Sequence, residues 1–246
     1  FWGVSLLDSR GVITLPFPRE FMGMVGTFGP SLLGLIILIR YRGRSFKSII
    51  KETFAYRSDK RTAFLTFALM PAILGGSYVI TRFVFGVEYS LEWFDAPMFI
   101  PVVYAYILFL GGPLGEEIGW RGFALPDLMK RYSPFVASII LGLVWTFWHL
   151  PAFFIPGSAQ AGVSFPLYIV NTLVLTMVIT VIHLRMKRIS GALYFHASAN
   201  FALGIFYIID EPLGLLFIGI GMFTTLGVLL YRERKRMFYK AVEPTL

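Results

Sequence analysis

Long apolar segments alternate with short polar connections along this chain of 246 residues. A hydrocarbon core of about 30 Å needs about 20 apolar residues in each helix that spans it. Because no water reaches the backbone in lipid, such segments fold as helices, which satisfy their own hydrogen bonds. The pattern therefore predicts an all-α polytopic membrane protein with a single domain over residues 1–246. Seven segments qualify as spans: 21–39, 62–85, 97–125, 134–155, 166–184, 191–209 and 213–231.

The connections between these segments alternate in charge. Basic residues dominate the first, third and fifth connections and the C-terminal tail, whereas the second and sixth are acidic and the fourth is uncharged. Loops rich in lysine and arginine stay in the cytoplasm, so we expect a multi-pass protein of the cell membrane with a cytoplasmic C-terminus and residues 1–20 outside. Arg82, near the outer end of the second predicted span, is the one basic residue that does not follow this alternation. An odd number of spans that starts outside predicts a further helix before Phe1.

Composition excludes several classes of protein. Hydrophobic residues make up 57% of the chain and charged residues only 15%, against about 25% charged in soluble domains. The net charge of +8 follows the topology and faces anionic lipid headgroups, so we expect membrane lipid as a partner and no nucleic acid. Without cysteine, disulfides and thiolate metal sites are excluded. Residues 45–56 show the spacing of an amphipathic helix at the membrane surface.

Two adjacent carboxylates, Glu116 and Glu117, interrupt one of the most apolar stretches. A charge at bilayer depth costs at least about 2.5–3.5 kcal/mol, which makes such a residue a candidate for function. Arg121 follows Glu117 at the i,i+4 spacing that allows an ion pair on one helix face. Glu116 points about 100° away around the helix, so it is the carboxylate without a built-in partner.

Two further predicted spans carry polar residues. His149 follows Trp145 by four residues in a segment that is otherwise almost wholly apolar, and His196 and Asn200 share one helix face. Each residue alone has a structural explanation, as an ion pair, a hydrogen bond to a carbonyl or a contact between helices. For all of them together this explanation is weak, because each one costs insertion energy.

These side chains suit hydrolysis. A partly desolvated carboxylate can take a proton from water, imidazoles can orient that water, and His196 with Asn200 can donate hydrogen bonds to an oxyanion. Glu116, His149 and His196 are also a donor set used by catalytic zinc, although not in the helical H-E-x-x-H arrangement. The sequence therefore leaves open whether the site holds one divalent metal.

The chain resembles the CPBP family, which contains the CAAX proteases and bacteriocin-processing enzymes. Residues 116–121 match its EExxxR motif, residues 145–149 resemble FxxxH with Trp145 in place of Phe, and residues 196–200 match HxxxN. The motifs occur in the family's order, and the resemblance spans roughly residues 20–231. At Trp145 we expect packing rather than chemistry.

The resemblance implies an intramembrane endopeptidase with eight helices whose site opens towards the cytoplasm. It implies that Glu116 and His149 activate water, that His196 and Asn200 stabilise the oxyanion, and that Glu117 and Arg121 support them. Metal dependence stays open. The implied partner is a peptide or protein substrate, and the sequence does not say whether it is prenylated.

Two other readings compete with the protease. A non-catalytic membrane binder or bacteriocin-immunity-type protein would keep the scaffold but would not need Glu116, His149, His196 and Asn200 together. A proton-coupled transporter could use a glutamate and two histidines as a relay, but it usually shows paired repeats with corresponding interruptions, and only Gly111–Pro113 interrupts a span here.

Depth in the membrane raises an objection to a shared site. His149 lies about fifteen residues, or roughly 22 Å, from the cytoplasmic end of its predicted span, whereas Glu116 lies about ten residues from its own. A shared site requires the helix that begins near Pro134 to protrude or tilt, or Gly111–Pro113 to break the preceding helix and shift Glu116.

Overall fold

The computed structural model describes residues 2–89, 96–206 and 212–239, and helices form all of the regular structure in these residues. The N-terminal half contains α1 (Trp2–Ser9), α2 (Arg19–Thr27), α3 (Gly29–Arg40), α4 (Phe46–Phe54), α5 (Lys60–Phe67), α6 (Leu69–Val84), η2 (Pro97–Phe99), α7 (Ile100–Leu110) and α8 (Pro113–Gly119). The C-terminal half contains η3 (Trp120–Ala124), α9 (Leu125–Met129), α10 (Pro134–Trp148), η4 (Leu150–Phe154), α11 (Phe165–Met186), α12 (Ile189–Ile205), α13 (Pro212–Arg232) and α14 (Arg234–Met237).

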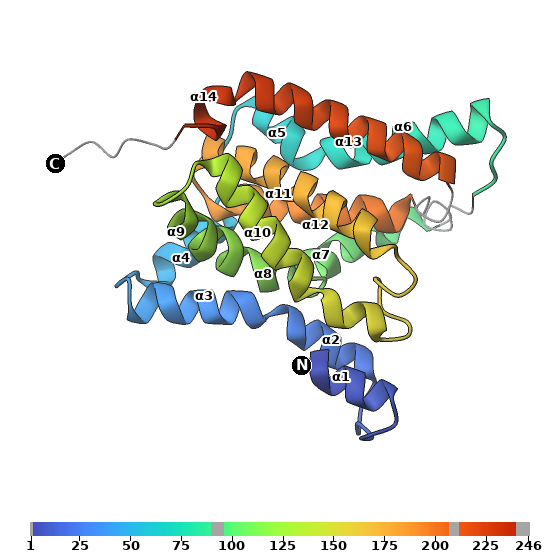
Figure 1. The fold of residues 1–246 in the computed structure, drawn as a ribbon, viewed down its shortest axis with the longest axis horizontal. Coiled ribbons are helices and arrows are strands. Elements are labelled where there is room, and N and C mark those ends of the chain that lie inside the picture. The colour runs from blue at the N-terminus through green and yellow to red at the C-terminus, as the bar shows by residue number, and fades with distance from the viewer. Residues whose placement is uncertain (1, 90–95, 207–211, 240–246) are drawn as a thin grey trace.

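The all-α fold is confirmed, and several helices are long and apolar enough to cross a membrane. Five such stretches occur in the described residues: Phe21–Arg40, Pro97–Met129, Pro134–Phe154, Phe165–Met186 and Pro212–Arg232. The pair α5 and α6, bent by 55° at Ala68, makes a sixth if it is one span. The long helices lie side by side along the long axis of the molecule (Figure 1).

The predicted count of seven spans is not confirmed. The segment predicted at 191–209 forms α12, which has 17 residues over Ile189–Ile205, or about 26 Å of helix. This helix lies in the middle of the bundle, where it contacts α4 through α8 and α11 (Figure 1). Residues 207–209 of the predicted segment lie outside the residues that the structure describes.

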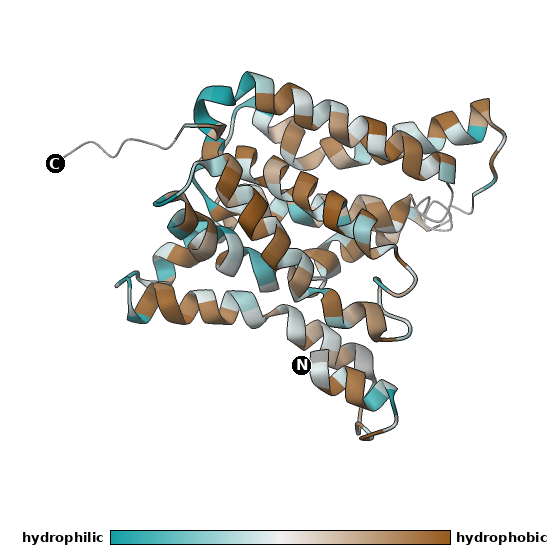
Figure 2. Ribbon diagram, in the orientation of Figure 1, coloured by the Kyte–Doolittle hydropathy of each residue, from teal (hydrophilic) through white to brown (hydrophobic). Residues whose placement is uncertain are grey.

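Hydrophilic residues gather at one end of the bundle, where α4, α9 and α14 lie (Figure 2). The predicted amphipathic helix is present there as α4, which begins after Ser45, whose hydroxyl accepts the N–H of Ser48. Ile49 is fully buried and packs with Leu38 and Ile118, whereas Phe46 is exposed. The apolar face of α4 therefore turns largely into the protein.

The predicted break between α7 and α8 lies at Gly111 and Gly112. Gly112 has φ +109°, a conformation that favours glycine, and Pro113 then occupies the first turn of α8, where proline is well tolerated. A Cβ at Gly111 would lie 2.8 Å from the Cα of Ile107. The interruption starts a new helix one turn before the glutamates, and thus sets where they lie along the bundle.

Two glycines that flank the glutamates let α8 touch α3 closely. Gly115 and Gly119 lie one turn apart, the spacing of small residues at close contacts between membrane helices. A Cβ at Gly119 would lie 2.2 Å from the carbonyl oxygen of Pro30, and one at Gly115 would lie 2.6 Å from that of Thr27. The hydroxyl of Ser31 also donates to the carbonyl of Leu114 at 2.8 Å. The end of α2 and the start of α3 therefore hold the face of α8 that carries the glycines.

We expect Gly119→Ala to destabilise the protein by about 1–3 kcal/mol or more, because α3 and α8 must move apart to admit a methyl group. Thermal unfolding of the purified protein in detergent measures the change. Gly227→Ala in α13 is the matched control, since a Cβ there meets nothing within 4 Å and alanine favours a helix. A Gly119→Ala protein as stable as the control would contradict this account of the contact.

Candidate active site

Glu117, at the centre of α8, holds one cation and one imidazole inside the bundle. Its Oε1 accepts a hydrogen bond from Nη1 of Arg121 at 2.9 Å and lies 2.9 Å from Nδ1 of His196 on α12. The side chains of Glu117 and Arg121 are both 0% exposed. The ion pair predicted from the i,i+4 spacing is therefore present. It also fixes the ring of His196, which the sequence did not predict.

Glu116 makes a separate set of contacts with α10. Its Oε2 accepts a hydrogen bond from the indole Nε1 of Trp145 at 2.5 Å, and its Oε1 lies 3.6 Å from Nε2 of His149. The Nε1 of Trp120 lies 3.4 Å from the same Oε2. Because the other nitrogen of His149 lies 2.9 Å from the carbonyl oxygen of Trp145, the ring presents Nε2 towards the carboxylate.

The meeting of Glu116 and His149 answers the objection from depth. Ser133 caps α10 through a hydrogen bond from the N–H of Val136, and His149 follows the last residue of this helix. Glu116 lies on α8, the new helix that begins after Gly112. Both features that could reconcile the two depths are present, namely the helix start at Pro134 and the break before α8.

Trp145 does more than pack. Besides its hydrogen bond to Glu116, its ring lies under the guanidinium of Arg121, with 4.8 Å between the carbon Cζ and the ring centroid. The ring of His196 meets it edge-on at 5.1 Å between centroids. The expectation of packing alone at this position is therefore incomplete, since one indole contacts members of both glutamate sets. An N–H donor that phenylalanine lacks makes the difference.

Asn200 lies one turn beyond His196 on α12, and its amide nitrogen donates to the carbonyl oxygen of Gly111 at 3.3 Å. This bond connects α12 to the break between α7 and α8. His196 keeps Nε2 free of hydrogen bonds to described residues, because Nδ1 makes its contact with Glu117. The ring is thus oriented with one nitrogen available to a substrate.

Three candidate metal ligands, Glu116, His149 and His196, lie in this region. Among the described residues, no group of three or more histidine, cysteine, aspartate or glutamate side chains is placed to hold an ion. Nδ1 of His196 faces Glu117, and Oε2 of Glu116 takes the indole N–H of Trp145. One coordinating atom of each residue is thus engaged within the protein, whereas Oε1 of Glu116 and Nε2 of both histidines make no hydrogen bond to a described residue.

The sequence reading missed a wide helical turn beside the site. Residues Trp120–Ala124 form a π-helix, in which the N–H of Leu125 reaches the carbonyl of Trp120. Pro126 accounts for it, since proline has no N–H to donate and its ring clashes with the carbonyl four residues earlier. Such turns are frequent at functional sites, and here it contains Arg121. Pro126 is the feature of the sequence from which this turn could have been predicted.

The fold and the site define a polytopic helical membrane protein with a buried centre of two glutamates and two histidines. A family model described as type II CAAX prenyl endopeptidase Rce1-like matches residues 98–202, the stretch that carries every site residue named above. The chain is also 28% identical to CAAX prenyl protease 2 of Methanococcus maripaludis over 237 residues, which cover 87% of this chain and 82% of that protein. The resemblance to the CAAX protease family is thereby confirmed, and this homology supports an intramembrane protease.

We expect Glu117→Gln and Arg121→Ala each to lower the stability of the folded protein by about 3–5 kcal/mol, because either change leaves a buried charge without its partner. Expression yield and thermal unfolding in detergent measure the effect. The pair Asp127 and Arg42, which is partly exposed, offers the control, since Asp127→Asn should cost little. Wild-type stability in both buried variants would contradict the assignment of the ion pair.

We expect Trp145→Phe to lower kcat/KM about tenfold while KM changes little, because the carboxylate of Glu116 loses the hydrogen bond that the indole N–H donates to it and is no longer held in place. In a protein that already carries Glu116→Gln, adding Trp145→Phe should not lower kcat/KM further. Trp148→Phe is the matched control on the same helix, since the buried Nε1 of Trp148 has no hydrogen-bond partner among the described residues. Equal losses in the two variants would assign Trp145 a packing role only.

Proposed function

We propose that this chain is an intramembrane endopeptidase in which Glu116 activates water for attack on a peptide bond. The observation that carries the proposal is that the two adjacent glutamates have different contacts. Glu117 is occupied by Arg121 and His196, whereas Glu116 receives only uncharged indole donors and faces the imidazole of His149. A carboxylate that no fixed cation contacts is the better proton acceptor of the two.

The proposed reaction follows from these positions. Glu116 accepts a proton as water attacks the peptide carbonyl, with His149 orienting that water from its Nε2. The amide of Asn200 donates a hydrogen bond to the oxyanion that forms on the carbonyl oxygen. Nε2 of His196 donates a second one when the ring is protonated on both nitrogens, because the Nδ1–H already faces Glu117. When the carbon–nitrogen bond breaks, the proton returns from Glu116 to the departing amine. Glu117 and Arg121 take no proton and hold His196.

The proposed cleavage lies near the cytoplasmic side of the membrane. Its support is the sequence of the polar end of the bundle. Hydrophilic residues gather where α4, α9 and α14 lie (Figure 2), and these segments contain many of the lysines and arginines. Loops rich in lysine and arginine stay in the cytoplasm. The C-terminus would then be cytoplasmic. The relative's name specifies a CAAX prenyl protease, so prenylated CAAX-type peptides are the first substrates to test, beside unmodified peptides of the same sequence.

We expect Glu116→Gln to lower the rate of peptide cleavage by about 10²–10⁴-fold, because the amide keeps the shape of the side chain but cannot accept the proton. Cleavage of the two peptide series by purified protein, followed by mass spectrometry, measures the loss. Glu88→Gln is the control, since Glu88 is 84% exposed. Near-normal turnover by Glu116→Gln would remove Glu116 as the base. Peptide binding by the wild-type protein without any cleavage would favour the non-catalytic binder.

We further propose that the reaction runs without a metal, because Glu116, His149 and His196 are not grouped closely enough in the described structure to hold one ion together. Protein treated with a strong chelator should keep its cleavage rate. Elemental analysis and the activity assay on the same sample check this. About one zinc ion per chain, whose removal stops cleavage and whose return restores it, would instead establish a metal-dependent hydrolase.

A further inference from the structure

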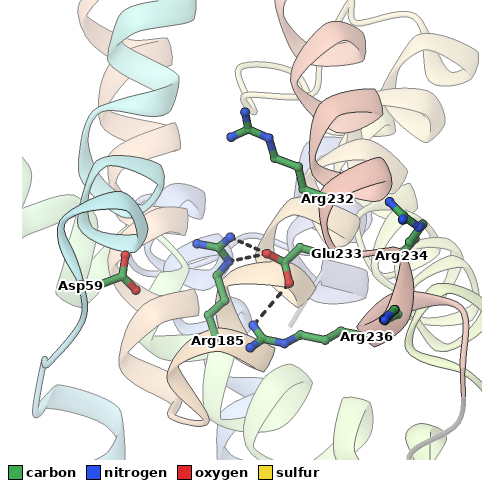
Figure 3. A pocket seen from close by; sticks show the side chains of 7 residues that line it. Asp59, Arg185, Arg232, Glu233, Arg234 and Arg236 are labelled. Atoms are coloured by element: carbon green, nitrogen blue, oxygen red, sulfur yellow. Dashed lines mark hydrogen bonds and ion pairs between the residues drawn. The ribbon is translucent and has the colours of Figure 1, made fainter.

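A second site candidate lies away from the glutamates, at the basic end of the bundle. A pocket of about 560 Å³ opens where the N-terminus of α5 and the C-termini of α11 and α13 meet α14, and we call it the basic pocket (Figure 3). Five cationic side chains and two carboxylates line it. Its net positive charge favours an anionic occupant.

The two carboxylates are already used by the protein. Glu233 accepts a hydrogen bond from Nε of Arg185 at 3.0 Å and pairs with Arg236 at 3.3 Å, and Figure 3 shows these two arginines reaching it from different sides. Asp59 caps α5 by accepting the N–H groups of Arg61 and Thr62, each at 3.0 Å. The bond from Thr62 is the main reason that the pKa of Asp59 lies below its ordinary value. Asp59 therefore caps its own helix, and Glu233 joins the ends of α13 and α11.

The remaining three cations stay available. Arg232, Arg234 and Lys235 are exposed and make no ion pair with any residue that the structure describes. Arg232 and Arg234 project away from Glu233 (Figure 3). The guanidinium of Arg234 lies over the ring of Tyr231, 4.9 Å from its centroid, and donates to the carbonyl oxygen of the same residue at 3.1 Å. These contacts leave its other N–H groups free for a ligand.

An exposed apolar surface leads up to the basic pocket. Along α13, Leu216, Ile220 and Phe223 follow at i, i+4 and i+7 and are each more than half exposed, and Tyr231 at the end of this helix is 71% exposed. A water-soluble anion makes no use of such a surface. A lipid does, because its acyl chains can lie along the helix while its phosphate reaches the cations at the helix end.

We propose that the basic pocket binds the headgroup phosphate of an anionic phospholipid through Arg232, Arg234 and Lys235, with the acyl chains against α13. Basic pockets between membrane helices are a known setting for anionic headgroups, and each cation near the lipid surface contributes about 1 kcal/mol, a factor of about five in affinity. The site lies at the end of the bundle, so the proposal stands independently of the catalytic role of Glu116.

The test compares two triple variants that remove the same charge. Arg232→Gln, Arg234→Gln and Lys235→Gln together alter the basic pocket and spare Arg185 and Glu233, which join the helices. Lys47→Gln, Lys51→Gln and Arg57→Gln together remove three exposed cations elsewhere on the same side of the protein. Native mass spectrometry of the full chain in detergent, titrated with phosphatidylglycerol or phosphatidylcholine, measures lipid binding.

We expect the wild-type protein and the control to bind one phosphatidylglycerol at least about tenfold more tightly than phosphatidylcholine. The pocket variant should bind phosphatidylglycerol about ten to a hundred times more weakly than the control does. If the triple variant unfolds, Arg232→Gln alone should still lower the stabilisation of the folded protein by phosphatidylglycerol in thermal unfolding.

Two results would overturn the proposal. An equal loss of affinity in both triple variants would mean that net charge alone attracts the lipid, without a site. Stabilisation by glycerol phosphate in water that equals the stabilisation by phosphatidylglycerol would mean that the pocket takes a soluble phosphate rather than a lipid.

Discussion

The buried ion pair between Glu117 and Arg121 is the interaction on which the centre of this molecule depends. Two fully buried opposite charges avoid the cost of isolated charges in a medium without water, and their i,i+4 spacing means that a single helix supplies both. The same carboxylate holds His196 on α12. One side chain therefore pairs with the buried guanidinium and contacts the imidazole of a second helix.

Glu116 is next to Glu117 on the same helix but has a different environment. Glu116 points about 100° away from Glu117, so it meets α10 and its indole and imidazole groups rather than the guanidinium. Trp145 lies between the two sets and contacts Arg121, Glu116 and His196. The side chains at these positions share partners. The effects of substitutions on stability are therefore not expected to add when two of these positions are changed together.

The backbone that carries this centre is held by small residues and by irregular turns. Gly115 and Gly119 bring α8 against the end of α2 and the start of α3. Gly112 allows the break before α8, and Pro126 accompanies the π-turn after it. In a membrane, close packing between helices replaces much of the hydrophobic driving force that holds a soluble core together. The short helix α8 is therefore fixed from both ends and along one face.

The sequence by itself determined the class of fold, the buried ion pair and the residues of the candidate site, because a charge in an apolar segment is costly wherever it lies and helical spacing is local. The tertiary structure decided which partners meet across helices. The contact of Glu117 with His196, the hydrogen bond from Trp145 to Glu116 and the central position of α12 depend on helix orientation and depth. These in turn come from packing between segments far apart in the chain, which no local pattern encodes.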